Sequence, residues 1–326
     1  MASWLPNSDC IPWLTVLSLE CLAIVIFNII TIIVFVKQRR LQRRSTYLII
    51  HLAIIDLLVG AVSGPLQIDK NIWSCDLYNV SGWDQIWSSH VTSVVLHLFS
   101  FTSLVNLVFI SLERFHATFL PFKHRFVKKW IYGVIITVIW LTTTARESAE
   151  IMLREKGIQS YGTIAAILYL PFYLISVFLI CACFILIVVK VRCSRHPYHH
   201  GAASLRERKL TGTSLIVALV SLLCYLPVIT YIAISIYNTQ VFRDISWRSH
   251  YHIRMTVALT FLANSIVNPK IYALRLQYSE RMYQKYSAGL HPVQSNMICH
   301  FATSGQLGLN VAQQLLEQEL SSFIYH

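Results

Sequence analysis

Charged residues are scarce in this sequence. Asp, Glu, Lys and Arg make up 13% of its 326 residues, whereas a soluble globular domain carries roughly 25%. Hydrophobic residues reach 55%, and the mean hydropathy is +0.55. This composition excludes a disordered chain, a collagen-like chain and a small disulfide scaffold. It indicates a polytopic membrane protein.

The sequence also lacks the spacings that mark catalytic and metal motifs. None of its eight cysteines forms a C-x-x-C pair, so no zinc or redox motif is indicated. Its thirteen histidines are scattered, and no Ser/His/Asp or His/Asp arrangement has catalytic spacing. We therefore expect a protein that is not an enzyme and has no organic cofactor.

Seven apolar runs are each long enough to cross a bilayer, which takes about 20 residues per helix. The fourth is the least regular, because its clean part ends near Ala145 and charged residues follow. The runs predict an all-α bundle of seven transmembrane helices over residues 11–286. They are Ile11–Val36, Thr46–Ile68, Ile86–Phe115, Trp130–Leu153, Ile164–Val191, Leu210–Tyr237 and Tyr251–Ala273.

Lys and Arg are distributed unequally between the two sides of the predicted bundle. Eighteen lie in the loops and tail of one side and seven in those of the other, so the net charge of +12 indicates membrane topology rather than nucleic-acid binding. The positive-inside rule predicts an extracellular N-terminus at residues 1–10 and a cytoplasmic, largely disordered tail at 287–326. Asn79 is then an extracellular glycosylation site. The amphipathic pattern of Leu274–Tyr286 predicts a short helix on the inner membrane surface.

Several polar residues interrupt the apolar runs. An ionisable group within a membrane span costs roughly 3 kcal/mol on insertion scales, so such residues are usually functional. Carboxylate, hydroxyl and amide oxygens suit a small hard cation, but they equally suit a polar network that holds helices together. These residues are Asp56, Glu113, Arg114, Asn28, Ser103, Asn264, Ser265 and Asn268.

Prolines interrupt four of the runs. Proline removes a backbone donor and kinks a helix, and kinks in several helices of one bundle favour a structure that moves. They are Pro65, Pro171, Pro227 and Pro269.

These motifs, taken in order, resemble a class A, rhodopsin-like G-protein-coupled receptor from Ile11 to about Tyr286. The first-helix asparagine, the second-helix Leu-Ala-x-x-Asp and the Glu-Arg-Phe at the end of the third helix all have family counterparts. So do a fourth-helix tryptophan, a Cys-Tyr-Leu-Pro and an Asn-Ser-x-x-Asn-Pro-x-x-Tyr. The matching positions are Asn28, Leu52–Asp56, Glu113–Phe115, Pro121, Trp140, Pro171, Cys224–Pro227 and Asn264–Tyr272.

The resemblance implies roles for these residues. Asn28, Asp56, Ser103, Asn264, Ser265 and Asn268 would form an allosteric sodium pocket. Glu113 and Glu207 would hold Arg114 in the resting state, and their release would let the sixth helix move outward. Phe122, which follows Pro121, would dock the G protein, and Asn268, Pro269 and Tyr272 would complete the switch. The implied partners are a heterotrimeric G protein, arrestin, membrane lipid and an extracellular ligand, at the plasma membrane. The alternative function is a multi-pass transporter or channel.

The sequence departs from the family at several positions. Ser89 replaces the third-helix cysteine of the usual extracellular disulfide, and a bond between Cys10 and Cys75 is an open alternative. Tyr225 replaces the usual switch tryptophan. Leu96 stands where amine receptors have an aspartate, so the ligand is unassigned. The candidate ligand pocket is Ser93, Leu96, His97, Ser100, Tyr225 and Tyr231.

Overall fold

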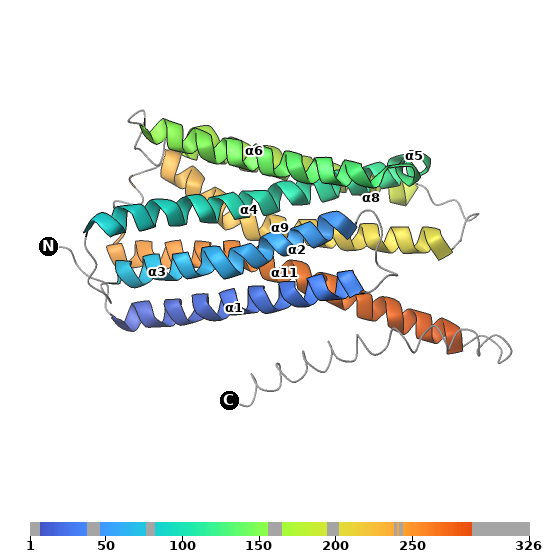
Figure 1. Cartoon of the computed structure of the whole chain (residues 1–326), viewed down its shortest axis with the longest axis horizontal. Coiled ribbons are helices and arrows are strands. Elements are labelled where there is room, and N and C mark those ends of the chain that lie inside the picture. The colour runs from blue at the N-terminus through green and yellow to red at the C-terminus, as the bar shows by residue number, and fades with distance from the viewer. Residues whose placement is uncertain are drawn as a thin grey trace.

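The computed structural model describes residues 7–37, 46–75, 82–155, 165–193, 202–237, 240 and 244–288. Every regular secondary-structure element within these residues is a helix. Seven helical rods lie side by side, and successive rods run in opposite directions (Figure 1). The first rod is α1 (Asn7–Lys37), and the second combines α2 (Thr46–Leu58), η2 (Val59–Ser63) and α3 (Gly64–Ser74). The third rod is α4 (Gly82–Phe119), and the fourth is α6 (Lys129–Glu155). The fifth combines η3 (Ala165–Tyr169) and α8 (Leu170–Cys193), the sixth is α9 (Ala202–Tyr237), and the seventh is α11 (Trp247–Ala288).

Six of the seven predicted apolar runs lie within one of these rods, and the fifth does so from Ala165 onward, because Ile164 lies outside the described residues. Among the described residues, five helices are long and apolar enough to cross a membrane: Ser8–Lys37, Thr46–Ile72, Thr92–Phe119, Ile167–Lys190 and Ile216–Tyr237. The two remaining rods, α6 and α11, carry more charged side chains. The chain is therefore an all-α, multi-pass membrane protein, as the composition predicts.

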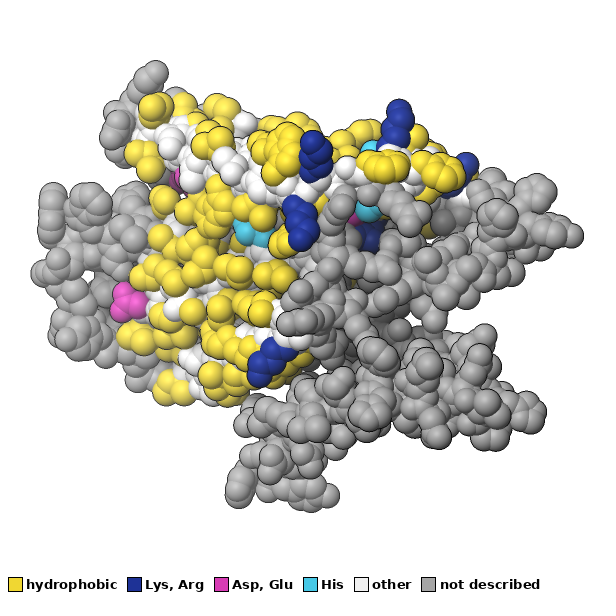
Figure 2. All heavy atoms as spheres, turned by 45° about the vertical axis from the view of Figure 1, so that its right-hand side comes forward, with side chains coloured by type: hydrophobic (Ala, Val, Ile, Leu, Met, Phe, Trp, Pro, Cys, Tyr) yellow, Lys and Arg dark blue, Asp and Glu magenta, His cyan; other side chains and the backbone are white. Residues whose placement is uncertain are grey.

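The outer face of the bundle is apolar. On α1, exposed leucines, isoleucines and valines recur every three or four residues, while Leu17, Ile24 and Asn28 on the opposite face are buried. Figure 2 shows hydrophobic side chains over most of the described surface in that view, with few charges among them. Because water would not tolerate so large an apolar surface, this face is suited to contact with lipid.

Two of the four prolines follow wide helical turns. The π-helix η2 precedes Pro65, and the π-helix η3 precedes Pro171. A proline lacks an N–H and its ring collides with the carbonyl four residues earlier, and a π-turn moves that carbonyl away. Pro227 and Pro269 instead lie inside α9 and α11, which continue past them.

The π-turn also brings the second rod close to α1. A Cβ added to Gly60 would lie 2.8 Å from Cγ2 of Ile24, and one added to Gly64 would lie 2.5 Å from Sγ of Cys21. Glycines four residues apart let two membrane helices approach closely. Gly60 and Gly64 form a Gly-x-x-x-Gly pattern in the sequence, which is not among the predicted features.

The predicted helix at Leu274–Tyr286 differs from the structure in one respect. These residues are helical, but they are the uninterrupted continuation of α11 rather than a separate short element. The helix continues there because the sequence from Lys270 to Ala288 contains no proline or glycine that would interrupt its backbone hydrogen bonds. Residues 289–326 of the predicted tail lie outside the described residues.

Candidate functional site

A disulfide joins the start of α1 to the end of α3. Cys10 and Cys75 are bonded, with their Cα atoms 6.2 Å apart and a sequence separation of 65. The hydroxyl of Tyr251 lies 3.6 Å from Sγ of Cys75. The alternative that the sequence left open is therefore the arrangement in the structure. Asn79, the predicted glycosylation site, lies outside the described residues.

A surface ion pair closes the same end of the bundle. Nη2 of Arg248, at the start of α11, donates to Oδ1 of Asp9 at 2.6 Å. This hydrogen bond, together with the negative charge of Asp9, raises the pKa of Arg248 above its ordinary value. Because Arg248 is largely exposed, the pair adds little to stability.

The middle of the bundle holds a fully buried carboxylate, that of Asp56 in α2. Its Oδ1 accepts hydrogen bonds from Ser103 at 3.1 Å and Ser265 at 2.9 Å, and its Oδ2 accepts one from Asn268 at 2.8 Å. The donors come from α4 and α11, so the carboxylate connects three rods. The structure thus brings together four of the six residues predicted for a sodium pocket.

The other two predicted members lie beside this group and have different partners. Asn28 of α1 donates to the backbone oxygens of Ile24 and Ser265 at 2.9 and 3.0 Å. Asn264 donates to the hydroxyl of Tyr225 at 3.2 Å. Both amides support the walls around Asp56 rather than contacting its carboxylate.

The chemistry of this group suits a small cation. A buried carboxylate without a positive partner is costly in a medium of low dielectric, and the described residues place no Lys, Arg or His against Asp56. Among the described atoms, the buried side-chain oxygens of Asn264 and Asn268 have no hydrogen-bond partner. Oxygen ligands of this kind suit a hard cation such as sodium.

A second charged group lies at the end of α4. Nη2 of Arg114 contacts Oε2 of Glu113 at 2.6 Å, and Arg114 is only 2% exposed. Nε and Nη1 of Arg114 are buried with no hydrogen-bond partner among the described atoms. The guanidinium is therefore held by one hydrogen-bonded ion pair and has donors left over.

Two partners of Glu113 are new relative to the sequence analysis. Nε2 of His124 lies 2.8 Å from Oε1 of Glu113, and the hydroxyl of Tyr132 lies 3.4 Å from the same oxygen. Because an ionised carboxylate only accepts hydrogen bonds, Nε2 of His124 carries the proton. The helix α5, Pro121–Arg125, brings His124 back toward α4.

The predicted docking residue Phe122 is 84% exposed and follows Pro121, the first residue of α5. Its ring thus extends from the bundle next to the Arg114 end of α4. The other predicted partners of this end, Glu207 in α9 and Tyr272 in α11, have helical backbones, but their side chains lie outside the described part of the structure. Pro269 is buried in α11.

Three of the predicted ligand-pocket residues lie in different surroundings. Ser93 accepts a hydrogen bond from Lys70 at 3.2 Å, and Leu96 packs with an apolar cluster that includes Leu17 and Met255. Tyr225 is fully buried deeper in the bundle, beside Asn264.

The three remaining members of that group lie on α4 and α9. Tyr231 contacts His250 at 3.2 Å, and burial, followed by the charge of Arg254, lowers the pKa of His250. Ser100 is buried in α4. His97 faces Tyr169, with His97 Nδ1 and the tyrosine hydroxyl 3.1 Å apart.

A further buried polar chain connects α2, α4 and α6. Nε1 of Trp140 donates to Nε2 of His51 at 3.0 Å, and Nδ1 of His51 lies 3.2 Å from Oδ1 of Asn106. Asn106 in turn donates to the carbonyl of Leu48 at 3.0 Å. Since one ring nitrogen accepts and the other donates, His51 is a neutral imidazole with its proton on Nδ1.

Comparison with known proteins agrees with this arrangement. The family described as "7 transmembrane receptor (rhodopsin family)" matches residues 27–164. Somatostatin receptor type 1 of Rattus norvegicus is 22% identical over 289 residues, which cover 82% of this chain and 69% of that receptor. The chain is therefore similar to rhodopsin-family seven-transmembrane receptors over residues 27–164, which is less than half of its length.

Two further relatives are more similar over shorter stretches. Dopamine receptor 2 of Drosophila melanogaster is 33% identical over 147 residues, which cover 43% of this chain and 25% of that receptor. Histamine H4 receptor of Rattus norvegicus is 28% identical over 139 residues, which cover 42% of this chain and 34% of that receptor. The chain thus spans about a third or less of these two relatives. The family match at 27–164 contains Asn28, Asp56, Glu113 and Arg114.

Proposed function

We propose that this chain belongs to the rhodopsin family of seven-transmembrane receptors and is a G-protein-coupled receptor of the plasma membrane. In this proposal it senses an extracellular ligand and activates a heterotrimeric G protein by outward movement of α9, without covalent chemistry. The observation that carries the proposal is the buried Arg114. Glu113 holds it by a single hydrogen-bonded ion pair, and its remaining donors lack partners among the described atoms.

The geometry around Arg114 supports a two-state switch. A buried guanidinium with unsatisfied donors is costly, so a partner that satisfies those donors shifts the equilibrium toward the conformation that admits it. The exposed ring of Phe122 lies next to this end of α4 and offers an apolar contact for such a partner. A G protein is the partner we infer, and arrestin is a second partner for the same surface.

Topology and the sodium ion form part of the proposal. Lys and Arg are more numerous in the loops and tail on the side of the bundle opposite to the N-terminus. This distribution favours an extracellular N-terminus, with the disulfide of Cys10 and Cys75 on the outer side. The buried carboxylate of Asp56 would hold an allosteric sodium ion with Ser103, Ser265 and Asn268. The ligand is not assigned, because the relatives are named for dopamine, histamine and somatostatin, and Leu96 offers no charge to an amine.

A test uses cells that express the full chain together with sensors of heterotrimer dissociation for each G-protein class. We expect wild type to increase basal or ligand-driven dissociation of at least one class as its surface level rises. Arg114→Ala should abolish this signal at the same surface level. A wild-type receptor that is as silent as Arg114→Ala with every sensor and every library ligand would refute the proposal.

A further inference from the structure

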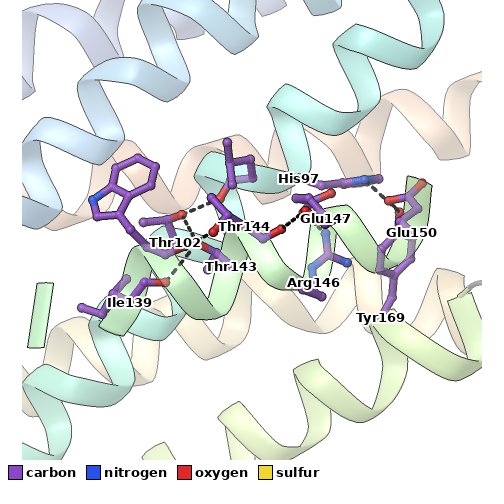
Figure 3. Close-up of polar contacts among 12 residues, drawn as sticks. His97, Thr102, Ile139, Thr143, Thr144, Arg146, Glu147, Glu150 and Tyr169 are labelled. Carbon is purple, nitrogen blue, oxygen red and sulfur yellow. Dashed lines mark hydrogen bonds and ion pairs between the residues drawn. The ribbon is translucent and has the colours of Figure 1, made fainter. Parts of the chain in front are cut away.

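The last turns of α6 bury three charged side chains. Arg146, Glu147 and Glu150 are 7%, 4% and 1% exposed, although they follow the point where the apolar run of α6 ends in the sequence. These side chains of α6 point toward His97 of α4 and Tyr169 of η3 (Figure 3). Buried ionisable residues in membrane helices usually face a partner or a pathway. Their contacts therefore decide what this group can do.

The hydrogen bonds fix the tautomer of His97. The hydroxyl of Tyr169 donates its only hydrogen to Oε2 of Glu150. Its contact with Nδ1 of His97 at 3.1 Å must then use the tyrosine oxygen as acceptor. A neutral His97 consequently carries its proton on Nδ1 and its lone pair on Nε2. A metal-binding histidine typically has this pattern, with one nitrogen donating to a fixed neighbour and the other on the metal.

The three buried side chains of α6 carry unequal numbers of positive and negative charges. Glu147 and Glu150 together carry two negative charges, whereas Arg146 supplies one positive charge. Arg146 pairs with Oε1 of Glu147 and lies over the ring of Phe101, 3.7 Å from its centroid. Oε2 of Glu147 is buried and has no hydrogen-bond partner among the described atoms. This unpartnered carboxylate oxygen, buried close to a second carboxylate, favours a bound cation.

The three candidate ligands converge from two helices. One ligand atom each of His97, Glu147 and Glu150 lie within 4.8 Å of one another. Zinc bonds of about 2.0–2.2 Å place tetrahedral ligand atoms roughly 3.4 Å apart, so small rotamer changes would close the site. A nitrogen ligand beside two carboxylates favours zinc over calcium or magnesium, which prefer oxygen ligands alone. The near-complete burial of both glutamates favours an ion over an organic molecule.

We propose that His97, Glu147 and Glu150 form a zinc-binding site that joins α4 to α6, with the hydroxyl of Tyr169 in η3 orienting its ligands. Three protein ligands leave a fourth position for water or for an anionic group of a ligand. The hydroxyls of Thr102 and Thr143, 3.1 Å apart, hold α4 and α6 together next to the site (Figure 3). The proposal does not depend on G-protein coupling.

The test is a direct measurement of zinc on the purified full chain in lipid nanodiscs. The protein is first treated with EDTA, then incubated with zinc chloride and desalted, and its retained zinc is measured by mass spectrometry. We expect wild type to retain one zinc ion per chain and to unfold at a higher temperature with zinc than without. His97→Gln and Glu150→Gln should lose both effects.

Matched controls separate this site from adventitious binding. Glu20→Gln changes a glutamate in α1, and His250→Gln changes a histidine at the rim of the bundle, so both should retain zinc as wild type does. Cobalt bound in place of zinc should give visible absorption bands in wild type, and His97→Gln should lose them. If His97→Gln and Glu150→Gln retain as much metal as wild type, the metal is an adventitious ion only and the proposal is wrong. The proposal is also wrong if wild type retains no zinc.

A milder variant covers the case in which a ligand substitution prevents folding. Tyr169→Phe removes only the hydroxyl that supports His97 and Glu150. Loss of a supporting hydrogen bond typically weakens metal affinity roughly 10–100-fold, and we expect that loss here. Unchanged zinc affinity in folded Tyr169→Phe would contradict the proposed support. Silence in the G-protein assay with normal zinc retention would refute only the proposed receptor function.

Discussion

At Asp56, side-chain donors from two other helices converge on one fully buried carboxylate. Its charge state and its partner therefore influence how α2, α4 and α11 pack. The Arg114 group at the end of α4 follows the opposite pattern, since its guanidinium has donors in excess of acceptors. The two sites are thus suited to different partners: Asp56 to a cation, and Arg114 to a group with hydrogen-bond acceptors.

Asp56→Asn tests the cation at the first site. In wild type, the unfolding temperature of the purified receptor should rise when sodium replaces a bulky organic cation at constant ionic strength. At a sodium concentration ten times its Kd, bound sodium contributes about 1.4 kcal/mol. Asp56→Asn should lose this dependence, and Asp9→Asn should keep it. An equal sodium response in Asp56→Asn would exclude the pocket.

Glu113→Gln tests the restraint on Arg114. The substitution removes the negative charge but keeps the size of the side chain, and a charge-assisted hydrogen bond contributes about 1.5–3 kcal/mol. The closed state should lose stability, so basal nucleotide exchange on the G protein should rise roughly tenfold. Exchange measured with purified receptor and G protein would contradict this reasoning if Glu113→Gln were no faster than wild type.

At the scale of elements, the π-turns η2 and η3 let two rods absorb their prolines without breaking. The wide turn at η2 also places Gly60 and Gly64 against α1, where a larger residue would collide with Ile24 or Cys21. The contact between the first two rods therefore depends on two residues that have no side chain.

Gly60→Ala compared with Gly133→Ala tests this contact. A Cβ at Gly60 meets Ile24 and a backbone oxygen within about 3 Å, whereas a Cβ at Gly133 meets nothing within 4 Å. Overpacking costs about 1–3 kcal/mol, so Gly60→Ala should lower the unfolding temperature of the purified receptor. Gly133→Ala should leave it unchanged or raise it, because alanine favours a helix. Equal behaviour of the two variants would argue against close packing at Gly60.

For the whole molecule, the seven apolar runs predict the rods well, because a membrane helix needs a long apolar stretch. The polar contacts are harder to predict. His124 reaches Glu113 only because α5 reverses the chain, and no local pattern encodes that contact. Arg146, Glu147 and Glu150 resemble the polar end of a span in sequence, yet they are buried because side chains of α4 and η3 pack against them. The family motif identified the residues around Asp56 but not which of them contact its carboxylate.

The disulfide between Cys10 and Cys75 restrains the first two rods as a unit. Closing a loop of this length contributes about 4 kcal/mol in the chain-entropy description, so Cys10→Ser should lower the unfolding temperature and the surface level. Cys75→Ser should have the same effect, and the double variant should be no worse than either one. Larger losses in the double variant would indicate that the two cysteines act separately.

The most direct test of the account is the separation of the inner ends of α4 and α9, measured by electron-spin distances on the full chain. One label is placed beside Phe119 and the other beside Ala203, through unnatural amino acids that leave the native cysteines untouched. We predict that a bound G protein increases this distance in wild type and not in Arg114→Ala. Identical distances in wild type with and without the G protein would contradict the account.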